Sequence, residues 1–89
     1  MRKPTKDERE YLGKVASLGC VVCGDEAQVH HRTGAGMGLR ASHYKTIPLC
    51  HRHHQGTEGI HQIGVKTWEE RYDTQDHFIQ LVQQALGHD

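Results

Sequence analysis

Four residues with the chemistry of zinc ligands stand in two short pairs, Cys20-Val-Val-Cys23 and Cys50-His-Arg-His53. Two residues separate the ligands of each pair, and at this spacing a tight turn can direct both side chains at one tetrahedral ion. Together the pairs would form a closed Cys3His site that leaves no coordination position for water. The spacing therefore predicts a structural zinc ion. The alternative is that the cysteines are small buried hydrophobic residues or free thiols.

Two adjacent histidines, His30 and His31, lie in a short segment that suits a strand. Successive side chains of a strand point to opposite faces, so these two should not bind the same ion. We expect one to bind a metal and the other to act as a base. An imidazole with a pKa near ~6.5 can deprotonate water at neutral pH if a hydrogen bond holds its other nitrogen. The alternative is a pair of structural or solvated histidines.

The same argument, that neighbouring side chains point in different directions, applies to a second adjacent pair, His53 and His54, on a helix. Neighbouring helical residues diverge by about 100°, so His53 can face the zinc ion while His54 faces a second ion. His61 lies seven residues further on, which is about 10.5 Å along a continuous helix and too far to share that ion. Only a break near Gly56 or Gly59 would bring His61 back to His54. Otherwise His61 is a surface or structural histidine.

Capping signals and periodicity outline the elements that must position these side chains. Thr5 and Glu8 have the form of a capping box, which predicts a helix over about residues 6–18. We expect a strand at residues 29–31 and an extended segment at residues 44–49, where Pro48 argues against a central strand position. A helix should open at Cys50 and end near residue 55.

The C-terminal third of the chain should be helical. Thr67 and Glu70 repeat the capping-box pattern, and apolar residues at positions 78, 79, 82, 85 and 86 mark an amphipathic helix that ends at Gly87. We expect Trp68 and Phe78 to pack these helices together.

Size and composition predict one domain over residues 1–89 with a thin core, because 35% of the residues are hydrophobic and 6% aromatic. A core this small needs additional stabilisation, for example by a structural metal ion. The odd cysteine count of 3 and the charged first ten residues favour a reducing, cytoplasmic setting. No apolar run approaches the ~20 residues of a membrane helix, so no membrane partner is expected.

The formal net charge is +0, which argues against wholesale electrostatic binding to nucleic acid, but the charges are segregated along the chain. Residues 67–89 hold 5 acidic residues against Arg71, while residues 27–57 hold none. That central segment could meet phosphates while an acidic C-terminal helix faces elsewhere, or the asymmetry is chance. His43 and His51 could touch phosphate or be solvated. The candidate nucleic-acid contacts are Arg32, Arg40, Lys45 and Arg52.

Three motifs make the chain resemble the HNH family of ββα-metal (His-Me finger) nucleases, in its zinc-knuckle branch. The motifs are Cys20-Val-Val-Cys23-Gly24, Val29-His30-His31 and Leu49-Cys50-His51-Arg52-His53-His54, and the likeness spans about residues 20–61. The chain also looks like the phage-encoded Ref-like, RecA-dependent nucleases, through the run Ile-Pro-Leu-Cys-x-x-His-His followed by Gly59-Ile60-His61.

The resemblance implies a small α+β fold, with an N-terminal helix, a two-stranded hairpin and metal-site helix clamped by zinc, and C-terminal helices. It implies that His31 is the general base. His30, where many members have Asp, would hold one catalytic divalent cation (Mg²⁺, Mn²⁺, Ni²⁺ or Zn²⁺) together with His54 and His61. The family's central Asn is missing, and Lys45 stands at about its position. The orientation of His31 is therefore unexplained.

The implied activity is metal-dependent hydrolysis of DNA phosphodiester bonds in phage or prophage recombination or DNA processing. Contacts to the DNA backbone carry little base specificity, so we expect a weak sequence preference. A recombinase filament or a second copy of the chain would be a plausible partner besides DNA. The main alternative is a non-catalytic zinc module that binds nucleic acid or protein. A third reading is a histidine-rich metal buffer or sensor.

Overall fold

The computed structural model describes residues 3–33 and 42–88. In these two ranges the chain is a small mixed α/β protein with a two-stranded sheet. Its elements in chain order are α1 (Lys6–Ser17), β1 (Gln28–His31), β2 (Thr46–Leu49), α2 (His51–His54), α3 (Ile60–Ile63), α4 (Val65–Arg71) and α5 (Gln75–Ala85). Within the same ranges, none of the helices combines the length and the apolar character needed to cross a bilayer.

Helix α1 begins and ends as its sequence predicts. The Thr5 hydroxyl accepts a hydrogen bond from the Glu8 backbone N–H at 3.2 Å, and the Glu8 carboxylate accepts one from the Thr5 N–H at 2.8 Å. This reciprocal pair satisfies backbone donors that the first helical turn would leave without partners. Gly19 ends the helical segment with φ at 81°, a conformation that side chains disfavour. The chain then turns into the loop that carries Cys20.

The two strands pair antiparallel, with Val29 opposite Pro48 and His30 opposite Ile47. Each strand of a two-stranded sheet is an edge, so Pro48 is tolerated although it cannot donate a backbone hydrogen bond. Its carbonyl accepts one from the Val21 N–H at 3.0 Å. This bond ties the loop that contains Cys20 and Cys23 to β2.

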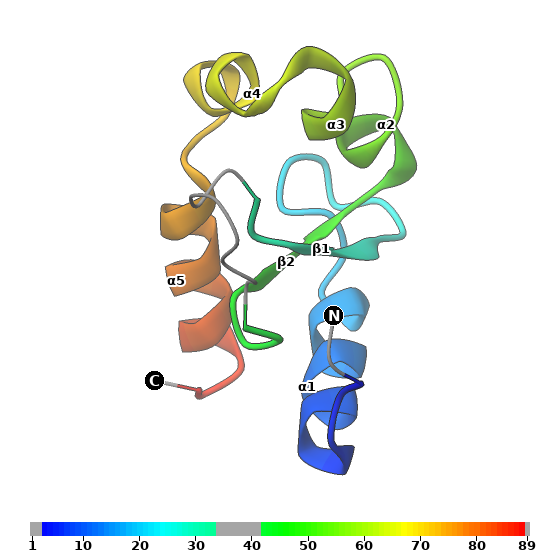
Figure 1. Cartoon of the computed structure of the whole chain (residues 1–89), viewed down its shortest axis with the longest axis vertical. Helices are drawn as coiled ribbons and strands as arrows, with labels where there is room; N and C mark the ends of the chain where they lie inside the picture. Colours follow the sequence, from blue (N-terminus) through cyan, green and yellow to red (C-terminus); the bar gives the residue numbers. More distant parts are fainter. Residues whose placement is uncertain (1–2, 34–41, 89) are drawn as a thin grey trace.

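The sheet lies between two of the helices, as Figure 1 shows, with α1 on one side and α5 on the other. Helices α2, α3 and α4 lie together beyond one end of the sheet. The core is built around β2, whose four residues are all buried. The apolar side chains packed there include Val15, Ile47, Leu49, Ile79 and Val82.

Trp68 anchors the C-terminal helices to the metal-ligand segment. Its side chain is 0% exposed, and its indole N–H donates to the His53 carbonyl at 3.1 Å. Its ring also meets Phe78 at a centroid distance of 5.8 Å. The predicted packing of α4 and α5 through Trp68 and Phe78 is therefore confirmed, and the same side chain fixes the end of α2.

One predicted helix start is wrong. Thr67 does not cap a helix, because α4 already begins at Val65 and Thr67 lies inside it. The residue that caps α5 is Thr74, whose hydroxyl accepts a hydrogen bond from the His77 N–H at 3.1 Å. The T-x-x-E pattern is not specific to helix starts. A threonine inside a helix with a glutamate three residues later also matches it, but there the backbone N–H groups are already bonded within the helix and cannot donate to the hydroxyl. The predicted end at Gly87 is correct.

Candidate metal centres

The loop between α1 and β1 forms a tight turn around Cys20. The Cys20 N–H donates to the Asp25 carbonyl at 2.8 Å, and the Gly24 N–H donates to the Cys20 carbonyl at 2.8 Å. The Val22 N–H reaches the Cys20 sulfur at 3.4 Å. A turn of this kind directs Cys20 and Cys23 to the same side, toward the start of α2.

The Cys3His cluster, made of Cys20, Cys23, Cys50 and His53, brings four ligand atoms within 4.8 Å of one another. The Cys23 and Cys50 sulfurs are 3.6 Å apart, and His53 Nδ1 lies 3.1 Å from the Cys50 sulfur and 3.7 Å from that of Cys20. Sulfurs bound to one tetrahedral zinc ion are separated by ~3.8 Å, given Zn–S bonds of about 2.3 Å. The cluster therefore fits a single zinc ion, as the spacing predicts.

The pKa values of two thiols in this cluster are shifted in opposite directions. Burial raises the pKa of Cys20, but hydrogen bonds from the backbone of Cys50, Cys23 and Val22 outweigh it, so that the pKa lies below its ordinary value. A backbone hydrogen bond at Asp25 lowers the pKa of Cys23, but desolvation and the sulfurs of Cys50 and Cys20 raise it to about 11. Sulfurs this close cannot all carry negative charge unless a cation compensates them.

A second group, the histidine cluster, consists of His30, His54 and His61, with one ligand nitrogen from each residue within 4.8 Å of the others. The ring centroids lie 5.0 Å apart for His30 and His54, 5.2 Å for His30 and His61, and 4.8 Å for His54 and His61. Strand β1 and helices α2 and α3 each supply one member. His30 and His54 are buried, and His61 is exposed, so the cluster opens to solvent on the side of His61.

The predicted break between His54 and His61 is what assembles this cluster. Helix α2 ends at His54, and α3 begins only at Ile60. Between them, Gly59 packs against the end of α2 so closely that a Cβ atom there would lie 2.5 Å from the His54 carbonyl carbon. The chain thus reverses over a short loop, and His61 returns to the side of His54.

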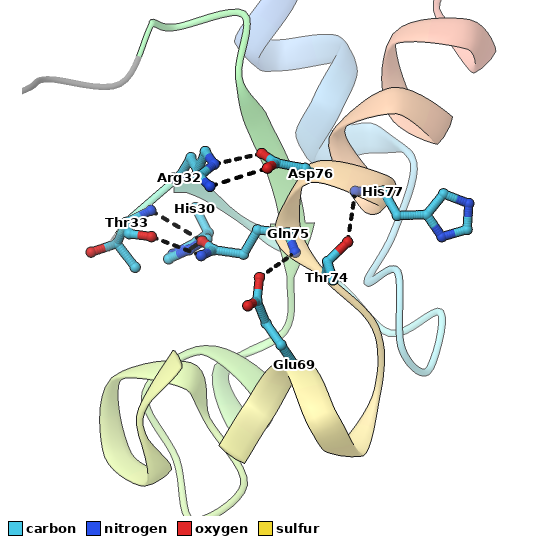
Figure 2. Close-up of polar contacts among 8 residues, drawn as sticks. All are labelled: His30, Arg32, Thr33, Glu69, Thr74, Gln75, Asp76 and His77. Carbon is cyan, nitrogen blue, oxygen red and sulfur yellow. Dashed lines mark hydrogen bonds and ion pairs between the residues drawn. The ribbon is translucent and has the colours of Figure 1, made fainter. Parts of the chain in front are cut away.

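Gln75 holds His30 from the first turn of α5 (Figure 2). His30 Nε2 donates to Gln75 Oε1 at 2.9 Å, and the glutamine side chain is 1% exposed. The amide is fixed by Thr33, whose N–H donates to Oε1 at 3.0 Å while its carbonyl accepts from Nε2 at 2.8 Å. The Gln75 backbone N–H in turn donates to Glu69 at 2.7 Å. His30 is therefore left with Nδ1 as its ligand nitrogen.

Gln28 holds His54 in the same way but through the other ring nitrogen. His54 Nδ1 donates to Gln28 Oε1 at 2.8 Å, which leaves Nε2 as the ligand nitrogen. Burial lowers the pKa of His30 to about 4, and burial with the nearby His61 lowers that of His54. Both rings are therefore neutral at neutral pH, the state in which imidazole binds metal.

His31 faces away from the histidine cluster, as strand alternation predicts, and pairs with His43. His31 Nε2 and His43 Nδ1 are 2.9 Å apart. Desolvation and His43 lower the pKa of His31. His43 is only 5% exposed, so the expectation that it is solvated or touches phosphate is wrong. The contact was missed because His43 stands 12 residues from His31 and belongs to no local motif.

Residues 1–88 match the family described as "Protein of unknown function (DUF968)". The chain belongs to this family. The match extends over both clusters of the DUF968 chain, and the description names no activity, so the likeness to HNH nucleases stays a prediction.

Two of the predicted phosphate contacts in this DUF968 chain are engaged in ion pairs. Arg32 Nε lies 2.5 Å from Asp76 Oδ1, so the N-terminal end of α5 packs beside the basic segment, contrary to the expectation that this acidic helix faces elsewhere. Arg52 pairs with Glu58 at 3.2 Å. Lys45 is exposed. Arg40 lies outside the described residues.

Proposed function

We propose that this chain is a metal-dependent endonuclease of the HNH type, which hydrolyses DNA phosphodiester bonds with weak sequence preference. The observation that carries the proposal is the combination of two candidate metal-ligand sets around β1, β2 and α2, with a further histidine, His31, next to the candidate ligand His30. The succession of β1, β2 and α2 is consistent with a ββα-metal fold. Phage or prophage DNA processing in the cytoplasm is the setting that we infer for it.

The two ligand sets suit different tasks. The Cys3His cluster offers four protein ligands and is closed, which is typical of structural zinc. The histidine cluster offers three imidazole ligands, and three protein ligands leave coordination positions free, as in catalytic sites. A divalent cation held there would polarise a phosphate group and stabilise the charge that develops on its oxygens.

The protein groups around this centre have separate roles in the proposal. His31 lies on the opposite face of β1, with Nε2 at 2.9 Å from His43 Nδ1, and would take the proton from water. Gln75 and Gln28 orient His30 and His54. Exposed Lys45 is the best remaining candidate for a phosphate contact, because Arg32 and Arg52 already pair with acidic residues.

Cleavage of supercoiled and single-stranded DNA with Mg²⁺, Mn²⁺ or Ni²⁺ tests this function. We expect the wild type to nick DNA only with added metal, and His31→Ala to lose at least ~100-fold in rate, the usual contribution of a general base. His77→Ala is the matched control, because His77 is an exposed histidine that pairs with Asp73. Zinc content and circular dichroism verify that each variant is folded.

The same experiment separates the proposal from a non-catalytic zinc module. The ion pairs of Arg32 and Arg52 favour a protein-binding form of that alternative, since they reduce the free positive charge that DNA could meet. A module would bind DNA or protein equally well as wild type and as His31→Ala, with no metal-dependent cleavage by either. Whether a second copy or a recombinase filament assists is a further proposal, tested by adding each to the cleavage assay.

A further inference from the structure

We propose that His43 is a positioning residue that accepts a hydrogen bond from His31 Nε2 and thereby keeps His31 Nδ1 free to take a proton. The inference rests on the proposed function, in which His31 is the base. The carrying observation is the 2.9 Å approach of His31 Nε2 to His43 Nδ1, with the two ring planes at 76° to each other.

His43 is built rigidly into the fold. Its side chain is 5% exposed, and its carbonyl accepts a hydrogen bond at 3.1 Å from the hydroxyl of Thr46, which is 0% exposed. The turn that contains His43, residues 42–45, is closed by the Lys45 N–H, which donates to the Ser42 carbonyl at 3.0 Å. The Arg32 N–H donates to the Lys45 carbonyl at 3.1 Å, which joins the turn to the residue after His31. The two rings are thus fixed relative to each other by backbone as well as side chains.

The direction of the hydrogen bond decides whether His31 can act. One proton lies between the two nitrogens, and a neutral imidazole carries only one. If His31 donates it, Nδ1 has a lone pair. If His43 donates, a neutral His31 carries its own proton on Nδ1 and cannot accept another there. An acceptor at His43 therefore selects the tautomer that a base requires.

The same contact also suits the charge that forms during the reaction. The O–H bond of the attacking water breaks, its proton goes to His31 Nδ1, and its electron pair forms the new bond to phosphorus. The leaving oxygen departs with the electron pair of the old P–O bond and takes a proton from solvent. His31 is then an imidazolium with an N–H on each nitrogen, and Nε2–H continues to donate to His43 throughout.

His43 supplies the group that orients His31, which the sequence pattern does not identify. The position expected to orient the base is Lys45, but this side chain is exposed, on the surface of the turn. His43, two residues earlier, is the one that is buried against His31. The orienting group thus enters from the same turn but from a different residue.

Three variants of the zinc-loaded full chain test the proposal. His43→Phe keeps a ring in the space but removes Nδ1, His43→Gln restores an oxygen acceptor, and His77→Phe is the control at an exposed histidine. We expect His43→Phe to lower kcat by ~10-fold or more with KM changed less than about twofold, because substrate binding does not involve this contact. His43→Gln should recover part of kcat, and His77→Phe should retain it.

Nitrogen-15 NMR of the histidine rings supplies a readout that does not depend on cleavage. The wild type should show His31 protonated on Nε2, and His43→Phe should show a mixture of both tautomers. A wild-type His31 protonated on Nδ1, or an unchanged kcat in folded His43→Phe, would overturn the proposal. If the wild type cleaves nothing, the proposed function fails, while the tautomer spectrum still decides the assignment of the hydrogen bond.

Discussion

His30 and His54 are held through different ring nitrogens, and this decides which atoms can meet at one ion. Gln75 binds His30 at Nε2, whereas Gln28 binds His54 at Nδ1. Outer hydrogen bonds of this kind fix the tautomer and the rotation of a metal-binding imidazole and raise its basicity. The two glutamines would therefore contribute to the affinity of the histidine cluster for a metal ion without touching that ion.

Replacing Gln75 by methionine tests this contribution. Gln75→Met keeps the volume of the buried side chain and removes its bonds to His30 and Thr33. We expect the affinity of the histidine cluster for Ni²⁺ to fall by ~10- to 100-fold, measured by calorimetry on protein whose zinc content is unchanged. Gln80→Met, at an exposed position of the same helix, is the control. Equal affinities of the two variants would contradict a role for Gln75.

Residues within one short motif were predictable, and their distant partners were not. The spacing of Cys20 with Cys23 and of Cys50 with His53 identified a group that the structure brings together. Gln75 stands 45 residues from His30, and a lone glutamine has no spacing pattern that distinguishes it from a solvated one. Such contacts depend on how α5 packs on the sheet, which periodicity does not specify.

At the scale of elements, the reversal between α2 and α3 matters most for the histidine cluster. The sequence indicated a break because glycine weakens a helix, and the structure adds the reason that glycine itself is needed. A Cβ atom at Gly59 would lie 2.5 Å from the His54 carbonyl carbon and 2.7 Å from the Gln55 nitrogen. Backbone atoms cannot move aside as a flexible side chain would, so any other residue must displace α3 from α2.

Gly59→Ala should therefore weaken both the fold and the histidine cluster. We expect the free energy of unfolding to fall by ~1–3 kcal/mol, the usual cost of overpacking, and Ni²⁺ affinity to fall with it as His61 moves away. Gly13→Ala is the matched control, because Gly13 lies in α1 and a Cβ atom there would meet nothing within 4 Å. There the change should stabilise by about 0.5–1 kcal/mol. Denaturant unfolding compares the two, and equal stabilities would refute the close-packing argument.

In the whole molecule, we expect the histidine cluster to depend on the Cys3His cluster, but not the reverse. Adjacent residues of α2, His53 and His54, belong to different clusters, so whatever fixes His53 also fixes His54. The Cys3His cluster joins the loop after α1 to the start of α2, and Trp68 adds a bond to the His53 carbonyl. The histidine cluster, by contrast, has an exposed member on a four-residue helix. Zinc should support the fold, and the second metal should depend on it.

Removal of each metal site in turn tests whether the histidine cluster depends on zinc. Cys50→Ser should lose zinc, much of its helical signal and Ni²⁺ binding together, because the binding energy of structural zinc, ~10–16 kcal/mol in zinc-finger peptides, is folding energy. His61→Ala should lose Ni²⁺ binding while keeping zinc and a thermal midpoint within a few degrees of the wild type, since His61 is exposed. Circular dichroism, metal analysis and calorimetry on both variants give the answer. A folded Cys50→Ser that still binds Ni²⁺ would show that the histidine cluster stands without zinc, and that the Cys3His cluster has some task other than holding α2 in place.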